Sequence, residues 1–185
     1  MSTGMTDLFT LKGRTALITG GSRGIGRMSA KGFLAQGAKV YISARKAQAC
    51  IDTAKELSQF GTCIAIPGDV STVAGAQALA DAYLALEPQL DILVNNAGAA
   101  WGADYDTFPE SGWDKVVDLN LKAPFFLTQI FTPALRKAAK TQVAKVINIA
   151  SIDGVSINAQ ETYSYAASKA GLIHLTKRMA LRLAK

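Results

Sequence analysis

The sequence predicts an α/β protein with a doubly wound parallel sheet that is covered by helices on both faces. Short segments rich in β-branched residues alternate along the chain with longer amphipathic segments, which is the order of repeated strand–helix–strand units. The short segments are apolar along nearly their whole length, as strands buried on both faces are. Since crossovers between parallel strands are right-handed, we expect three layers (helix, sheet, helix) and the strand order 3-2-1-4-5.

Five strands and five helices are predicted from this alternation. The strands are residues 15–19, 39–44, 63–67, 92–95 and 145–150, and the helices are residues 24–36, 48–60, 73–87, 113–137 and 163–183. Gly37 and Gly61 follow the first two helices, and glycine commonly ends a helix. A sixth parallel strand is expected after the last helix and is absent, so we interpret residues 1–185 as a single domain that is incomplete at its C-terminus.

The composition is that of a globular protein, with 49% hydrophobic and 18% charged residues. No apolar run approaches the length of about 18 residues that a membrane span needs, and no secretory signal is recognised, so no membrane association is expected. Cys50 and Cys63 do not form a CxxC pair, which favours two free, buried thiols over a disulfide. Together these features predict a cytoplasmic protein.

The net charge of +6 arises from 20 Lys and Arg residues against 14 Asp and Glu residues. The basic residues are scattered and are not interleaved with aromatic residues, so a small anionic ligand explains the charge and nucleic-acid binding is not expected. His174 is the only histidine in the sequence, and with two distant cysteines it does not make a metal site.

A glycine-rich segment, residues 19–26 (Thr-Gly-Gly-Ser-Arg-Gly-Ile-Gly), follows the first predicted strand and opens the first predicted helix. Glycines at this place allow a tight turn and a close approach of the backbone to a pyrophosphate, and the helix N-terminus offers N–H groups to the anion. A plain structural turn is the alternative interpretation. The position within a strand–helix–strand unit favours a dinucleotide-binding loop.

The end of the second predicted strand indicates which dinucleotide is bound. A carboxylate there would bind the ribose 2′-hydroxyl of NAD, but the chain has Ala44. Arg45 and Arg23 can both face a 2′-phosphate, which the planar guanidinium group suits. NADP(H) is therefore predicted in preference to NAD(H), the alternative being that Arg45 and Lys46 simply begin a solvated helix.

Tyr165 and Lys169 are four residues apart in the last predicted helix and so share one of its faces. A phenol has a reference pKa of about 10, and a neighbouring ammonium group stabilises the phenolate form. Such a pair can give a proton to a carbonyl oxygen or take one from an alcohol. Tyr163 has Ala167 in place of the lysine, so Tyr165 is the better candidate, although pairs of this kind also occur by chance on helix surfaces.

Ser151 follows the fifth predicted strand, at the edge where a doubly wound sheet presents its ligands. Its hydroxyl can hydrogen-bond the same carbonyl oxygen as Tyr165. The alternative is that Ser151 caps a turn or a helix. Trp101 and Tyr105 follow the fourth predicted strand and either line the substrate cleft or pack against the core.

The motifs, in this order, resemble those of the short-chain dehydrogenase/reductase family, whose fold is of the Rossmann type. The resemblance runs from residue 11 to residue 185. Its motifs are the glycine-rich loop, the pair Asp69-Val70, the Asn-Asn-Ala-Gly sequence at 95–98, Asn120, Ser151 and the Tyr-x-x-x-Lys pair. Within the family, the stretch from Ser151 to Lys169 resembles NADP-dependent 3-oxoacyl and ketone reductases.

The resemblance implies a role for each matched residue. The catalytic residues would be Asn120, Ser151, Tyr165 and Lys169. The cofactor-binding residues would be Gly20, Ser22, Arg23, Gly24, Ile25, Gly26, Arg45, Asp69, Val70, Asn96, Ala97, Gly98, Tyr165 and Lys169. A hydride would pass between nicotinamide and a carbonyl or alcohol carbon, with tyrosine as the general acid or base and serine polarising the carbonyl. Lysine would bind the nicotinamide ribose, and asparagine would hold a water.

The predicted function is therefore that of an NADPH-dependent reductase of a small carbonyl substrate, forming dimers or a homotetramer through its fourth and fifth helices. Ser151 and Tyr165 are 14 positions apart, slightly more than the resemblance predicts. Because the family continues beyond the equivalent of residue 185, two alternatives remain: a dinucleotide-binding sensor or scaffold without turnover, and an inactive fragment. A nucleic-acid binder ranks third, on charge alone.

Overall fold

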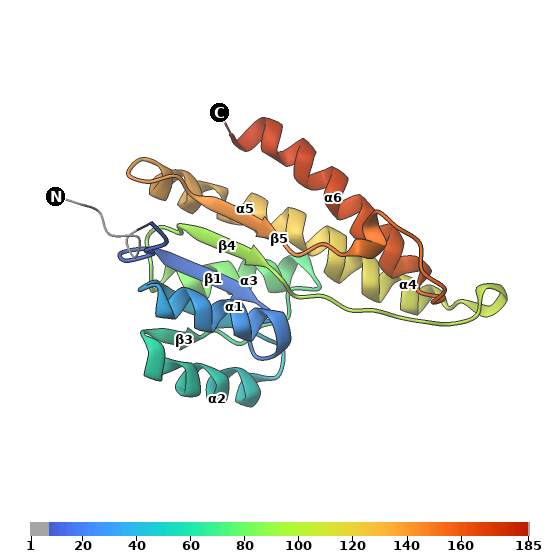
Figure 1. Cartoon of the computed structure of the whole chain (residues 1–185), viewed down its shortest axis with the longest axis horizontal. Helices are drawn as coiled ribbons and strands as arrows, with labels where there is room; N and C mark the ends of the chain where they lie inside the picture. The colour runs from blue at the N-terminus through green and yellow to red at the C-terminus, as the bar shows by residue number, and fades with distance from the viewer. Residues whose placement is uncertain (1–7, 185) are drawn as a thin grey trace.

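The sheet is parallel and has five strands over residues 8–184, the part of the chain that this computed structural model describes (Figure 1). The strands are β1 (Thr15–Thr19), β2 (Lys39–Ser43), β3 (Cys63–Ala65), β4 (Ile92–Asn95) and β5 (Lys145–Asn148). Their order is β3-β2-β1-β4-β5, and Leu17 of β1 lies in register with Tyr41 of β2 and Leu93 of β4. The predicted fold class and strand order are confirmed.

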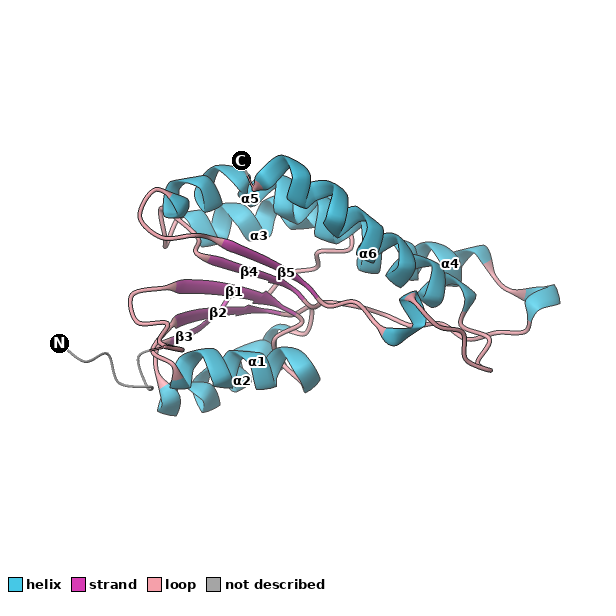
Figure 2. Cartoon of the chain, turned by 45° about the horizontal axis from the view of Figure 1, so that its top comes forward, coloured by secondary structure: helices cyan, strands magenta, loops and turns pink. Residues whose placement is uncertain are grey.

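Helices lie on both sides of the sheet, as Figure 2 shows. On one side are α1 (Gly24–Ala35) and α2 (Ala47–Leu57), and on the other are α3 (Val73–Leu84), α4 (Glu110–Val117), α5 (Ala123–Ala139) and α6 (Tyr163–Leu183). Short helical turns complete the described chain: η2 (Ser58–Phe60), η3 (Tyr105–Thr107) and η5 (Ile152–Gly154). Gly37 ends α1 with a φ of +89°, as predicted from its position.

The strands divide the core into two clusters because successive side chains point to opposite faces. Leu17 and Tyr41 pack toward α3 and α5, whereas Ile18 and Ile42 pack toward α1 and α2. Both cysteines are buried and free, as predicted, and burial raises the pKa of the Cys63 thiol to about 11. The near-continuous apolar strands are thus explained by packing on both sides.

Three predicted strands and three predicted helices end earlier than expected. β2, β3 and β5 stop at Ser43, Ala65 and Asn148. Beyond β3, the backbone N–H groups of Ile66 and Gly68 still donate to the carbonyl oxygens of Ile42 and Ala44, at 2.9 and 3.1 Å. The helix predicted at 48–60 tightens into η2 for its last turn, and the helix predicted at 24–36 ends at Ala35. The helix predicted at 73–87 ends at Leu84, and beyond it the amides of Leu86 and Glu87 both donate to the carbonyl oxygen of Tyr83.

The helix predicted at 113–137 is longer than expected and is interrupted. It comprises α4, a π-helical segment η4 (Asp118–Lys122) and α5. Pro124 follows the π segment and has no N–H, so the carbonyl of Asn120 lacks the donor that a regular α-helix would supply four residues later. π segments frequently occur at functional sites, and this one carries Asn120.

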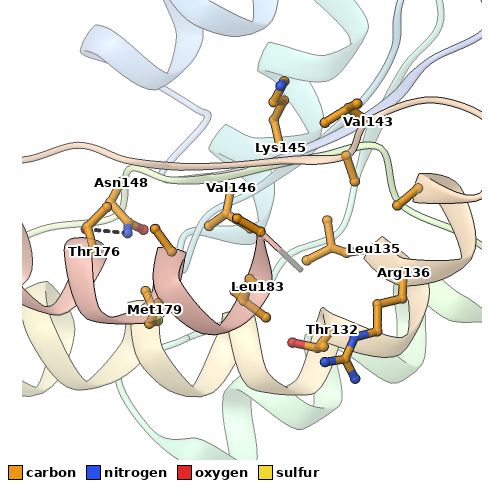
Figure 3. Close-up of a pocket in the computed structure, with 14 residues that line it drawn as sticks. Thr132, Leu135, Arg136, Val143, Lys145, Val146, Asn148, Thr176, Met179 and Leu183 are labelled. Atoms are coloured by element: carbon orange, nitrogen blue, oxygen red, sulfur yellow. Dashed lines mark hydrogen bonds between the residues drawn. The ribbon is translucent and has the colours of Figure 1, made fainter.

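β5 is an edge strand and is less covered than predicted, since the Ile147 side chain is 39% exposed. Beside it, a groove of about 460 Å³ runs between α5, β5 and α6. Figure 3 shows Leu135, Val146 and Met179 facing this groove. None of the residues predicted to bind cofactor or substrate lines it. Within residues 8–184, no helix has the length and apolar character required to cross a lipid bilayer.

Candidate cofactor and active site

A groove of about 720 Å³ lies along the carboxyl ends of β1, β2, β3 and β4. It brings together nearly all the residues predicted to bind the cofactor: Gly20, Ser22, Arg23, Gly24, Ile25, Arg45, Asp69, Val70, Asn96, Ala97 and Gly98. Three predicted cofactor-binding residues do not line the groove: Gly26, which lies against Gly20 of the loop, and Tyr165 and Lys169, which lie on α6. Residues from four separate stretches of the sequence therefore meet where the doubly wound fold presents its ligands.

The glycine-rich loop can be built only with glycines at several positions. Gly20 and Gly24 have φ angles of +65° and +53°, in the left-handed region that side chains disfavour. Gly26, in the first turn of α1, lies directly against the loop, and a Cβ there would lie 2.4 Å from the carbonyl oxygen of Gly20. The tight turn and the close approach predicted from the sequence are both present.

The N-terminus of α1 is open toward the groove. Arg23 is its N-cap residue, with an extended backbone and no side-chain capping bond, and the first turn contains no acidic residue. The first amides of a helix carry partial positive charge and need acceptors. Since no side chain of α1 supplies one, the arrangement suits the phosphates of a dinucleotide.

Asn96 and Thr19 fasten the loop after β4 to the glycine-rich loop. The Asn96 side chain donates to the carbonyl oxygens of Thr19 and Gly20 at 2.8 and 3.2 Å. In return, the hydroxyl oxygen of Thr19 accepts the backbone N–H groups of Asn96 and Ala97 at 3.1 and 3.0 Å. Sequence reasoning gave Thr19 no binding role of its own, although its place at the end of the first strand, directly before the first glycine, was visible.

Three exposed basic residues line the groove. Arg45 and Arg23 were predicted there, and Lys46, the N-cap residue of α2, lines the same surface. Ala44 follows β2 and precedes Arg45, so no carboxylate is present at the carboxyl end of β2. Asp69 also lines the groove, where its side chain accepts the backbone N–H of Ser71 at 3.0 Å. Arg45 and Lys46 directly precede α2, as the alternative interpretation held, and both residues also line the groove.

Tyr165 and Lys169 share one face of α6. The Lys169 ammonium nitrogen lies 5.6 Å from the centre of the Tyr165 ring and donates to the carbonyl oxygen of Ile149 at 2.6 Å. The side chain is buried, with an exposed fraction of 5%, and this burial lowers the pKa of Lys169. Tyr163 lies elsewhere: its ring packs edge-on against Tyr105.

Ser151 follows β5 and is half-buried. Its hydroxyl oxygen accepts the backbone N–H of Asp153 at 3.2 Å, so Ser151 caps the short turn η5. This is the capping role that sequence reasoning kept as the alternative. A hydroxyl used as an acceptor retains its proton for a further hydrogen bond, so capping does not exhaust it.

Asn120 is fully buried and is bonded through its whole side chain. Its oxygen accepts the Ala99 N–H at 2.8 Å, and its nitrogen donates to the Ala99 carbonyl at 2.8 Å and the Ser168 hydroxyl at 3.1 Å. A Cβ placed on Gly98 would lie 3.2 Å from the Asn120 oxygen and 3.9 Å from the Lys169 nitrogen. The π segment, the loop after β4 and α6 therefore meet at this asparagine.

Replacing Asn120 with alanine is expected to destabilise the fold by about 2–4 kcal/mol, because the Ala99 N–H, the Ala99 carbonyl and the buried Ser168 hydroxyl all lose a hydrogen bond together. The measurement is the free energy of unfolding from denaturant titration. Asn158→Ala is the matched control: Asn158 is exposed and makes one local bond, to the N–H of Gln160, so its loss should cost less than about 1 kcal/mol. Equal losses in the two variants would contradict the structural role given to Asn120.

The two aromatic residues with an open assignment differ in their surroundings. Trp101 packs against α4, where a Cβ on Gly112 would lie 2.7 Å from the indole ring and the Lys115 ammonium lies 5.0 Å above it. Tyr105 is 74% exposed and borders an aromatic pocket of about 580 Å³ at the ends of α4 and α6. Self-association through the helices predicted at 113–137 and 163–183, which correspond to α4 with α5 and to α6, stays a prediction.

Comparison with known proteins agrees with the fold and the order of motifs. A 3-oxoacyl-[acyl-carrier-protein] reductase of rhamnolipid biosynthesis from Pseudomonas aeruginosa is 50% identical over 180 residues, covering 97% of this chain and 70% of that protein. D-beta-hydroxybutyrate dehydrogenase from Cupriavidus necator is 33% identical over 179 residues, covering 95% of this chain and 67% of that protein.

Solved structures give the same result. The Pseudomonas aeruginosa RhlG/NADP active-site complex superposes with a TM-score of 0.93 at 50% identity, over 95% of this chain and 69% of that one. A short-chain type dehydrogenase/reductase from Mycobacterium marinum superposes with a TM-score of 0.90 at 33% identity, over 96% of this chain and 70% of that one. The family described as short chain dehydrogenase matches residues 14–185. The chain therefore belongs to the short-chain dehydrogenase family.

Proposed function

We propose that this protein is an NADPH-dependent reductase that converts a carbonyl group of a small substrate into a secondary alcohol. One observation carries the proposal: Tyr165 and the buried Lys169 share a face of α6, and a Cβ on Gly98, which lines the basic groove, would lie 3.9 Å from the Lys169 nitrogen. A protein that only bound a dinucleotide would have no need of a phenol held next to a desolvated ammonium group.

The residues that line the groove fit NADP(H), a dinucleotide that carries both a pyrophosphate and a 2′-phosphate. The glycine loop leaves no room for a Cβ at Gly26, the N-terminus of α1 is uncapped, and Arg23 and Arg45 border the end of the groove where a 2′-phosphate would lie. Bound there, nicotinamide supplies the hydride that reduces the carbonyl carbon. The related structure from Pseudomonas aeruginosa is an NADP complex, which supports the same cofactor for this chain.

Tyr165 is assigned the proton transfer. Its hydroxyl donates to the carbonyl oxygen as negative charge develops there, and it takes the proton back when an alcohol is oxidised. The Lys169 ammonium group stabilises the phenolate that remains, and a poorly solvated cation does so more strongly than an exposed one. The Ser151 hydroxyl keeps a proton free with which to polarise the same oxygen.

Asn120 is assigned a part in supplying protons through its backbone rather than its side chain. The side-chain amide is already bonded to Ala99 and Ser168. Its carbonyl oxygen has no helical donor four residues later, because Pro124 has no N–H. We propose that this carbonyl oxygen holds a water that links Lys169 to bulk solvent.

The substrate is proposed to be a ketone or a 3-oxoacyl thioester. This rests on the name of the Pseudomonas aeruginosa relative, a 3-oxoacyl-[acyl-carrier-protein] reductase, together with the Tyr165 and Lys169 chemistry. The test is NADPH oxidation by the purified protein, followed at its nicotinamide absorbance, across a set of ketones and 3-oxoacyl thioesters. We expect turnover with at least one of these carbonyl compounds. Tight NADPH binding without oxidation by any of them would instead support a non-catalytic dinucleotide-binding protein.

Arg45→Ala is expected to raise the Kd for NADPH by about tenfold while changing the Kd for NADH less than twofold, because only NADPH carries the 2′-phosphate. Both constants are measured by fluorescence titration. The matched control is Arg27→Ala: Arg27 lies on α1, pairs with Glu56 and does not line the groove, so both constants should stay unchanged. If Arg45→Ala weakened NADPH and NADH equally, Arg45 would not be the 2′-phosphate ligand.

A further inference from the structure

Ser43 is a buried polar residue whose hydroxyl has no hydrogen-bond partner among residues 8–184. Its exposed fraction is 1%, and it lines the cofactor groove at the end of β2, two positions before Arg45. A buried hydroxyl without a partner is unfavourable and uncommon in a folded protein. When such a group borders a binding groove, a ligand is the partner that would satisfy it.

We propose that Ser43 is a positioning residue for the cofactor: its hydroxyl forms a hydrogen bond with the adenosine half of the bound dinucleotide. This inference rests on the proposed function, since it needs a dinucleotide in the groove. Ser43 belongs neither to the glycine-rich loop nor to the basic residues that were predicted to bind the cofactor. The proposed Ser43 hydrogen bond does not involve the 2′-phosphate, which would be bound by Arg23 and Arg45.

The surroundings of Ser43 place it between the phosphate-binding loop and the end of β3. Its backbone carbonyl accepts the N–H of Gly21 at 3.0 Å, which joins the end of β2 to the glycine-rich loop. On its side-chain side lies Gly68, where an added Cβ would be 3.7 Å from the Ser43 hydroxyl oxygen. Gly68 is in turn bonded to the carbonyl of Ala44 at 3.1 Å, so the backbone on both sides is fixed.

The position in the groove is what distinguishes Ser43 from the other buried atoms that lack a partner. Among the described residues these atoms are the Ser43 hydroxyl, the Asn95 side-chain oxygen and the Ser164 hydroxyl. Asn95 is otherwise bonded, through its nitrogen, to Thr128 and Asn148. Ser164 lies on α6 with an exposed fraction of 0%. Neither of them lines the groove.

A serine hydroxyl can act as donor and as acceptor, so it can meet a ring nitrogen, an exocyclic amine or a ribose hydroxyl. All three groups belong to the adenosine half of NADPH and of NADH alike. Loss of the hydroxyl should therefore weaken both dinucleotides by the same factor. That pattern differs from the one expected for Arg45, whose loss should affect NADPH alone.

The test is Ser43→Ala, with Kd values for NADPH, NADH and adenosine 2′,5′-bisphosphate measured by calorimetric titration. We expect all three constants to rise by a common factor of roughly three to ten, the worth of one hydrogen bond. The melting temperature should stay the same or rise, because the unbound protein loses an unsatisfied hydroxyl. Nicotinamide mononucleotide, which lacks the adenosine half, should bind both proteins equally.

Ser164→Ala is the matched control, since it removes an equally buried and equally unpartnered hydroxyl outside the groove. Its Kd values should equal those of the wild type. The inference is overturned if Ser43→Ala binds all ligands as the wild type does, if it weakens NADPH alone, or if Ser164→Ala weakens binding as much. Failure of the wild type to bind either dinucleotide would instead refute the proposed function.

Discussion

Tyr165→Phe is expected to lower kcat for carbonyl reduction by about 10²–10⁴-fold, because the variant keeps the ring and loses the proton that the reaction needs. The Kd for NADPH should change less than twofold. The ring still packs above Lys169, and the residues that border the cofactor groove are untouched. Steady-state kinetics with the best substrate of the carbonyl screen and fluorescence titration of NADPH measure the two quantities.

Tyr163→Phe provides the matched control, on the same helix and two positions away. Tyr163 is exposed, and its ring contacts Tyr105 and Phe108 rather than Lys169. Removing its hydroxyl should leave kcat within about twofold of the wild-type value. Two results would count against the role given to Tyr165: a kcat that survives its replacement, or a loss of NADPH binding that accounts for the whole effect.

Gly26→Ala is expected to abolish measurable NADPH binding and to destabilise the protein by more than about 2 kcal/mol. The added methyl group would lie 2.4 Å from the Gly20 carbonyl oxygen and 2.5 Å from the Asn96 side-chain nitrogen. Those atoms belong to the loop itself and to the bond that fastens it, so neither can move without opening the phosphate site. Binding is measured by titration and stability by denaturant unfolding.

Gly32→Ala tests the same substitution on the same helix without the clash. A Cβ on Gly32 would meet no atom within 4 Å, and alanine is the better helix former, so we expect a gain of about 0.4–1 kcal/mol. NADPH binding should be unchanged. If Gly26→Ala bound NADPH normally, or if the two variants behaved alike, the close approach at Gly26 would not be what shapes the site.

Much of this site could be predicted from the sequence because each motif is local. The glycine-rich loop, the Asn96 to Gly98 segment and the Tyr165–Lys169 pair each occupy a few consecutive residues or one helical turn. The alternation of strands and helices then fixes which edge of the sheet they share. In the structure the loops do meet at one groove, and the lysine does lie against the tyrosine ring.

Other features were beyond sequence reasoning because they depend on contacts between distant residues. The π segment around Asn120 has the same apolar spacing as an ordinary helix, and only the position of Pro124 hinted at it. The part of Thr19 in fastening the loop, and the missing partner of Ser43, exist only once β1, β2 and β4 lie side by side.

The central claim is that the protein moves a hydride from NADPH to a carbonyl carbon with Tyr165 as the proton donor. The most direct measurement uses NADPH that carries deuterium at the transferred position of nicotinamide, with mass spectrometry of the product. We expect one deuterium on the carbinol carbon of the alcohol, formed by the wild type and by Tyr163→Phe but nearly absent with Tyr165→Phe. An alcohol product without deuterium, or equal labelled product from Tyr165→Phe, would contradict the claim.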